Sequence, residues 1–216
     1  MDYLKLYGLQ DAIIRAVMEP DNYFYLTGGT AIHRFYYNAR YSEDLDFFVT
    51  DSVTFHEDIR DILETLKAGH RVSVTVRSRD FYRLDVDGLK VDFVNDRVFR
   101  HGKSRIIEGV RVDNIVNILT NKLGAIMSRD EPKDVFDIFC IALNERFNWN
   151  EVLHIADRKT PVPRDALIYR LRTFPLKALE KVNTIRNIPI GARQMERLTA
   201  DILKGCENSL FRDMEP

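Results

Sequence analysis

The sequence lacks the features that mark several large classes of protein. Its 216 residues include only two cysteines, Cys140 and Cys206, which are too few for a framework of disulfides. No apolar run reaches the ~18 residues that a membrane helix needs, and no basic start precedes an apolar core at the first residues. Zinc-type histidine pairs and Cys-x-x-Cys motifs are also missing. We therefore expect a protein of the reducing cytoplasm, with no membrane segment and with Cys140 as a buried core thiol.

The chain has almost no net charge, but charges of one sign are concentrated in two segments. The net charge is −1, yet residues 43–64 hold eight acids and one base, and residues 158–197 hold ten bases and three acids. This asymmetry suggests an acidic part that carries a metal and a basic part that contacts a polyanion. Two solvated helix faces of opposite sign are the alternative.

Hydrophobic periodicity predicts a mixed α/β segment followed by an all-helical one. The first segment has strands expected at 23–27, 45–49 and 71–76, a hairpin within 82–94 that turns at Asp87-Gly88, and helices at 7–18, 30–37 and 55–68. Thr30 is the expected cap of the 30–37 helix. Helices follow at 114–128 and 131–143, and prolines break the rest into further helices. We expect an α+β fold, with a mixed sheet and flanking helices in residues 1–112 and a helical domain in residues 113–216.

A diglycine turn joins the first expected strand to the next helix. Gly28 and Gly29 allow the backbone to approach a phosphate closely, and the exposed amides of a turn and a helix start favour that anion. A turn without a ligand is the alternative reading of the same residues.

Three acids stand in or beside apolar strands. Asp44 and Asp46 are two residues apart, so both side chains leave one face, and Mg²⁺ is commonly held by one or two such carboxylates. Asp92 lies in another apolar strand, which a neighbouring position in the sheet would bring beside Asp46. Three converging carboxylates would suit metal-assisted phosphoryl transfer. Solvated acids, or a cross-strand ion pair of Asp92 with a lysine or arginine, are the alternatives.

Cations and acids also alternate on the two helices after residue 113. Lys122 and Arg129 are seven residues apart and share a helix face, so either can hold a triphosphate. Asp134 or Asp137 would orient them or act on an acceptor hydroxyl, and a pair of interhelical salt bridges is the alternative. Arg40 and Ser42, just before the acids, either lock their loop or contact phosphate.

These blocks together resemble a known family. The diglycine turn, the Asp-x-Asp strand and the later strand aspartate resemble the signature of the DNA polymerase β-like nucleotidyltransferase superfamily. Over roughly residues 20–145, the wider pattern resembles the AbiEii/AbiGii nucleotidyltransferase toxins; it consists of Gly28-Gly29-Thr30, Arg40-x-Ser42-x-Asp44-Leu45-Asp46-Phe47 and Lys122-Leu123-x-Ala125-x-x-x-Arg129-x-x-x-Lys133-Asp134-x-x-Asp137. The family usually has an arginine where this sequence has Lys133. Lysine keeps the positive charge but lacks the planar guanidinium group, which can bind a carboxylate or phosphate through two parallel hydrogen bonds.

The resemblance implies an enzyme of the EC 2.7.7 type, which moves a nucleoside monophosphate from a nucleoside triphosphate to an acceptor hydroxyl. It implies these catalytic residues: Asp44, Asp46, Asp92, Lys122 and Asp134, of which the first three would bind Mg²⁺ or Mn²⁺. It implies these nucleotide contacts: Gly28, Gly29, Thr30, Arg40, Ser42 and Arg129. The implied partners are RNA, such as transfer RNA, and a cognate antitoxin in a toxin–antitoxin or phage-defence pair. A small-molecule adenylyltransferase or phosphotransferase, or an inactive nucleotide- or partner-binding scaffold, are the alternatives.

Overall fold

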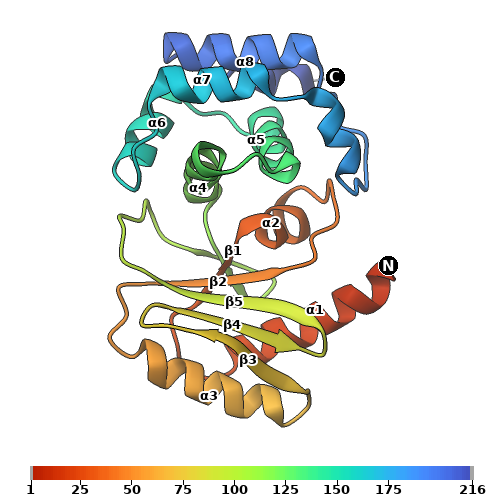
Figure 1. The fold of residues 1–216 in the computed structure, drawn as a ribbon, viewed down its shortest axis with the longest axis vertical. Helices are drawn as coiled ribbons and strands as arrows, with labels where there is room; N and C mark the ends of the chain where they lie inside the picture. Colours follow the sequence, from red (N-terminus) through yellow and green to blue (C-terminus); the bar gives the residue numbers. More distant parts are fainter. Residues whose placement is uncertain (1, 215–216) are drawn as a thin grey trace. The chain divides into compact units, whose positions relative to one another are not determined.

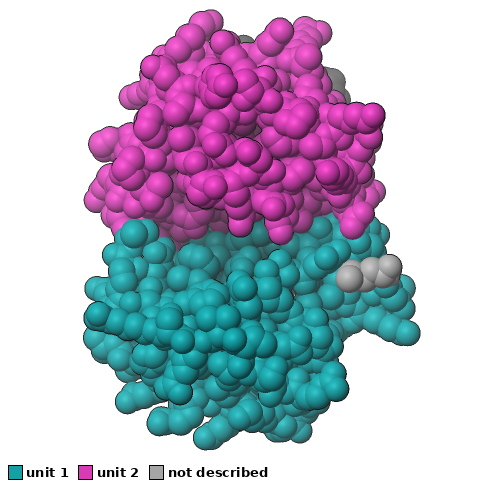
Figure 2. All heavy atoms as spheres, viewed as in Figure 1, with its two compact units in different colours: residues 1–36, 41–98, 103–114 teal, residues 37–40, 99–102, 115–216 magenta. Residues whose placement is uncertain are grey.

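The computed structural model describes residues 2–214, and the chain forms two compact units (Figures 1 and 2). The sheet unit comprises residues 1–36, 41–98 and 103–114, and the helical unit comprises residues 37–40, 99–102 and 115–216. The division into compact units falls after residue 114, two residues beyond the boundary expected after residue 112. In addition, two short segments of the first half belong to the helical unit.

The sheet unit is built on a mixed sheet of seven strands in the order β3-β4-β5-β2-β1-β7-β6. Its elements are α1 (Tyr3–Met18), β1 (Tyr25–Thr27), α2 (Gly28–Ala31), the π-helical turn η1 (Ile32–Tyr36), β2 (Leu45–Thr50), α3 (Phe55–Lys67), β3 (Val72–Arg77), β4 (Phe81–Val86), β5 (Leu89–Asp96), β6 (Arg105–Ile107) and β7 (Val110–Val112). The pairs β2–β5 and β1–β7 are parallel and the others are antiparallel. In Figure 1, β3, β4, β5 and β2 follow one another side by side. The predicted α+β class is confirmed.

Alternation along the strands gives the sheet one apolar face. Phe47 of β2 stacks on Phe93 of β5 with 5.3 Å between ring centroids, and Phe24 packs edge-on against Phe93 at 5.2 Å. Phe55 at the start of α3 covers Phe24 and Tyr82 on this same face. Each buried ring of this kind contributes about 1.5–3 kcal/mol to folding. Because side chains alternate, the neighbouring positions Asp46 and Asp92 are forced to the opposite face.

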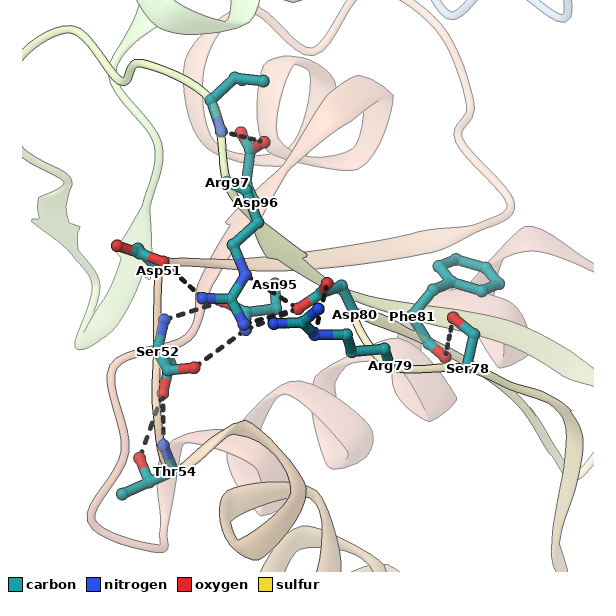
Figure 3. Close-up of polar contacts among 11 residues, drawn as sticks. Asp51, Ser52, Thr54, Ser78, Arg79, Asp80, Phe81, Asn95, Asp96 and Arg97 are labelled. Atoms are coloured by element: carbon teal, nitrogen blue, oxygen red, sulfur yellow. Dashed lines mark hydrogen bonds and ion pairs between the residues drawn. The ribbon is translucent and has the colours of Figure 1, made fainter.

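A polar cluster closes the ends of β2 and β5 (Figure 3). Arg97 forms ion pairs with Asp80, at 2.8 Å, and with Asp51. The side chain of Asn95 donates to the Ser52 carbonyl at 2.9 Å and to Asp80 at 3.0 Å, while the Ser52 amide donates to Asn95 at 2.8 Å. Hydrogen bonding from Arg97 lowers the pKa of Asp80. The cluster ties the loops at this end of the sheet to each other.

The helical unit is organised around a buried helix. Its elements are α4 (Ile115–Ser128), α5 (Pro132–Asn144), α6 (Trp149–Asp157), α7 (Arg164–Thr173), the 3₁₀ turns η2 (Leu176–Lys181) and η3 (Ser209–Met214), and α8 (Ala192–Lys204). α5 begins at Pro132, as the position of that proline predicts, and is buried from Asp134 to Leu143. Cys140 has no exposed surface, which confirms it as a core thiol, and burial raises its pKa.

The helix expected at 30–37 needs correction, one hairpin was not predicted, and one predicted turn is confirmed. The expected helix at 30–37 starts earlier, at Gly28, and changes to π-helical hydrogen bonding from Ile32 to Tyr36. Thr30 is therefore inside the helix and does not cap it. The β6–β7 hairpin did not show in the sequence pattern, because its strands have three residues each. The predicted turn at Asp87-Gly88 is present, with both residues at positive φ.

Candidate active site

Gly28 stands where β1 enters α2, against the carboxylate of Asp46. Thr27, the last residue of β1, is the register partner of Asp46 on β2. Gly28 has φ +70°, and a Cβ at this position would lie 2.5 Å from Asp46 Oδ2. Only glycine fits here, because it tolerates the left-handed conformation and leaves room for the carboxylate. The diglycine turn thus has a packing role toward Asp46, and its predicted role toward phosphate stays a prediction.

We expect Gly28→Ala to lower the nucleotidyl transfer that the resemblance implies by about tenfold or more, because the new methyl group would push Asp46 from its place. Gly88→Ala is the matched control: Gly88 also has positive φ (+88°), but a Cβ there would meet nothing within 4 Å. The control should lose only the ~1 kcal/mol of a strained backbone and keep its activity. Initial rates and urea unfolding of both variants test this, and equal rates would contradict it.

Asp92 is tied to an arginine of the neighbouring strand. Asp92 on β5 is the register partner of Asp46 on β2 and of Arg83 on β4. Arg83 Nε donates to Asp92 Oδ1 at 2.7 Å, and Arg83 Nη2 donates to Asp92 Oδ2 at 2.8 Å. The Asp92 side chain is 10% exposed. Asp92 therefore takes the cross-strand ion pair that was the alternative to metal binding.

Asp44 and its loop are held by three side chains. Lys90 Nζ donates to Asp44 Oδ2 at 2.8 Å. The Thr30 hydroxyl contacts the Asp44 carbonyl and the Ser42 hydroxyl, the latter at 2.9 Å. Gln10 Nε2 donates to the Ser42 carbonyl at 2.9 Å. Of the two roles considered for Ser42, the structure shows the locking of the loop.

The expected convergence of three carboxylates on a metal is not found. Among residues 2–214, no group of three His, Cys, Asp or Glu side chains is arranged to hold an ion. Arg83 binds both oxygens of Asp92, and Lys90 binds one oxygen of Asp44. Asp44 and Asp46 still offer hard oxygen donors two residues apart, and Mg²⁺ is usually bound by one or two carboxylates together with substrate phosphates. These two residues fit such an ion.

Sequence reasoning missed Arg83, Lys90 and Asp113. Lys90 was visible in principle, since it is two residues before Asp92 and so shares its strand face. Asp113 has no exposed surface and accepts a 3.0 Å hydrogen bond from the Thr27 hydroxyl. Its backbone amide donates to the Leu26 carbonyl at 2.8 Å. No short-range signal marks the contact of Asp113 with Thr27, because the two residues are 86 positions apart.

The helical unit holds a chain of alternating charges that is buried except at Arg129, whose side chain is 52% exposed. In order, it consists of Arg129, Asp134, Lys122, Asp137 and Arg40. Lys122 Nζ lies 2.7 Å from Asp134 Oδ1 and 2.7 Å from Asp137 Oδ2. Arg129 Nε donates to Asp134 Oδ2 at 2.7 Å. Arg40 binds Asp137 through two parallel bonds of 2.7 and 2.8 Å. We call these five residues the charge network.

The charge network consists of three basic and two acidic residues, which gives it a formal charge of +1. Asp134 and Asp137 have no exposed surface, and Lys122 is 7% exposed. Burial by itself would lower the pKa of Lys122, but the charges of Asp137 and Asp134 raise it above its usual value. Burial likewise works against Asp134, yet Lys122 and Arg129 lower its pKa. Salt bridges, the alternative in the sequence analysis, are thus present, and a contact of Lys122 or Arg129 with a triphosphate stays a prediction.

Comparison with models of known families identifies one family. The family model of the AbiEii nucleotidyl transferase toxin, of type IV toxin–antitoxin systems, matches residues 15–212. No curated protein matches the chain. JHP933 from Helicobacter pylori is similar in structure, with a TM-score of 0.58 and 22% identity over 92% of this chain and 88% of that one. MenT4, a nucleotidyltransferase toxin from Mycobacterium tuberculosis, has a TM-score of 0.59 and 14% identity over 97% and 84% of the two chains.

At these identities the two structures show a shared fold, while the family model supplies the relationship in sequence. Its match covers more than nine-tenths of the chain and includes the diglycine turn, the Asp44–Asp46 strand and the charge network. The predicted resemblance is confirmed, and the chain belongs to the AbiEii nucleotidyltransferase toxin family.

Proposed function

We propose that this nucleotidyltransferase moves a nucleoside monophosphate to a hydroxyl of an RNA, with a divalent cation held by Asp44 and Asp46. The observation that carries this proposal is the pair of carboxylates at the start of β2, where Asp44 directly precedes the strand and Asp46 lies within it, against the Gly28 turn. In the reaction, the acceptor oxygen bonds to the α-phosphorus while the bond to the β-phosphate breaks and pyrophosphate leaves. A bound Mg²⁺ or Mn²⁺ would neutralise charge on the phosphate oxygens.

The chain's own residues would position the reactants. The Gly28-Gly29-Thr30 turn fixes Asp46 and the Asp44 loop, so the two carboxylates need little reorganisation. For the charge network, we propose that its excess positive charge stabilises the phosphates of the nucleotide. We also propose that Asp92 helps to deprotonate the acceptor hydroxyl, which requires that Arg83 release the Asp92 carboxylate.

Charge supports RNA as the acceptor. Several lysines and arginines of the helical unit are exposed: Arg158, Arg172, Lys177, Lys181, Arg186 and Arg193. A surface of this kind binds the phosphate backbone of RNA independently of sequence. The family description also supports a cognate antitoxin as a partner. Within residues 2–214, no helix is both long and apolar enough to cross a bilayer, and we propose the cytoplasm as the site of action.

A labelling experiment tests the proposal. The protein is incubated with each α-³²P-labelled nucleoside triphosphate, Mg²⁺ and total cellular RNA, and in parallel with pools of sugars and aminoglycosides. We expect label on RNA, loss of that label with EDTA, and no label on RNA from a γ-³²P-labelled triphosphate, because the α-phosphate is the one transferred. The rate should also fall steeply with added salt.

The other outcomes distinguish the alternative functions. Label found only on small molecules would indicate a small-molecule adenylyltransferase, and transfer of the γ-label would indicate a phosphotransferase. No transfer to any acceptor would favour a binding scaffold over an enzyme.

A further inference from the structure

Two cations lie on the carboxylate face of the sheet, and the proposed function gives neither of them a role toward the metal. Lys90 contacts Asp44 at 2.8 Å, and Arg83 contacts Asp92 at 2.7 Å. The side chains of Lys90 and Arg83 are each 40% exposed, so neither is fixed in place by packing alone. A cation that is this accessible can leave its carboxylate without unfolding the sheet.

The sheet register places these groups in one charged array. Lys90 and Asp92 are two residues apart on β5, so their side chains lie on one face. Asp44 and Asp46 lie on this same face. Arg83 joins this face from β4 as the register partner of Asp92. The array contains three carboxylates and two cations. Without the cations, neighbouring carboxylates would repel each other.

The electrostatics of Arg83 extend beyond its direct partner. Its hydrogen bond with Asp92 and the charges of Asp92, Asp44 and Asp46 together raise its pKa. All three carboxylates thus interact with this one guanidinium. A divalent cation that approached Asp44 and Asp46 would meet the opposing charge of Arg83, and Lys90 already occupies an oxygen of Asp44.

We propose that Lys90 and Arg83 are resident counter-cations, with which a divalent cation competes for the carboxylates Asp44, Asp46 and Asp92. The proposal rests on the proposed function, in which Asp44 and Asp46 bind the metal. Competition of this kind keeps the metal affinity of the nucleotide-free enzyme low. The phosphates of a nucleotide, which bring negative charge, would then raise that affinity.

Mn²⁺ binding to the full chain without nucleotide tests the competition. Free Mn²⁺ is measured by its EPR signal during titration of the wild type and of two variants, Lys90→Met and Arg83→Met. We expect each variant to bind Mn²⁺ about threefold to fivefold more tightly, which is the scale of a partly exposed ion pair. Arg83→Lys, which keeps the charge, should stay close to the wild type.

Arg97 offers a matched control in the same unit. Its side chain is 41% exposed and pairs with the carboxylates of Asp51 and Asp80 (Figure 3), neither of which is a proposed metal ligand. Arg97→Met should leave Mn²⁺ affinity unchanged. Urea unfolding of each variant shows whether it is folded under the titration conditions.

The outcomes separate this inference from the function on which it rests. Tighter Mn²⁺ binding in Lys90→Met and Arg83→Met, but not in Arg97→Met, supports the competition. Binding by the wild type that is unchanged or weaker in both variants would overturn the inference alone. No binding by the wild type or by either variant would overturn the metal site itself, and the inference with it.

Discussion

Asp46→Asn should lower nucleotidyl transfer by about 100-fold or more while the protein stays folded. Asparagine has nearly the same shape as aspartate, so it still fits against Gly28. The added methyl group of Gly28→Ala, in contrast, would collide with the side chain at position 46. It lacks the negative charge that attracts a divalent cation, and stabilisation of this kind is worth several kcal/mol in the transition state. Initial rates at saturating Mg²⁺ and nucleotide measure the effect.

Asp61→Asn provides the control for this prediction. Asp61 is an exposed carboxylate on α3, in the same unit, with a 3.6 Å ion pair to its neighbour Arg60. Its replacement removes the same charge from the sheet unit and should change the rate by less than twofold. If Asp46→Asn kept the wild-type rate, Asp46 would not be a ligand of a catalytic metal.

Lys122→Met should lower the free energy of unfolding by about 3–5 kcal/mol. The side chain of Lys122 is the shared partner of Asp134 and Asp137, neither of which has any exposed surface. Removing it leaves two buried carboxylates with less compensation than their burial requires. Urea unfolding followed by circular dichroism measures the change. Lys177→Met, which removes an exposed lysine of the same unit, should change stability by less than about 0.5 kcal/mol.

The pH dependence of the free energy of unfolding tests whether the charge network causes the loss of stability in Lys122→Met. Because the pKa of Asp134 is lowered in the folded protein, its contribution is present above its unfolded value, near pH 4, and is lost as the pH falls through the folded value. The pKa of Lys122 is raised, so its contribution is present below about pH 10.5 and is lost above that. The wild type should therefore lose stability at both extremes. Lys122→Met should lose less of it at the alkaline one, and an unchanged alkaline limb would contradict the assignment.

The same variant also bears on the proposed role of the charge network toward phosphate. A purely structural role predicts that Lys122→Met, assayed well below its unfolding temperature, keeps the wild-type KM for the nucleotide. A role in binding phosphate predicts a higher KM at unchanged fold. The comparison requires the rates of the folded fraction, which the unfolding curves supply.

Local residue patterns determined much about this protein. Alternation predicted the strands around Asp46 and Asp92, because a half-buried strand must place every second side chain in the core. The Asp87-Gly88 turn and the start of α5 at Pro132 were predicted because backbone conformation at these residues depends on the residue types themselves and on their immediate neighbours. The diglycine turn, the Asp44–Asp46 segment, Asp92 and the segment from Lys122 to Asp137 were together enough to predict the family.

Tertiary structure decided which partner each charged side chain has. The pairing of Arg83 with Asp92 depends on the register between β4 and β5, and that of Lys90 with Asp44 on the parallel alignment of β2 with β5. The contact of Asp113 with Thr27 joins positions 86 residues apart. The sequence does not show which partner a charged side chain finds on another element, since any lysine or arginine can pair with any carboxylate that packing brings near. The physical reason is that charge has no periodicity along the chain, whereas burial does.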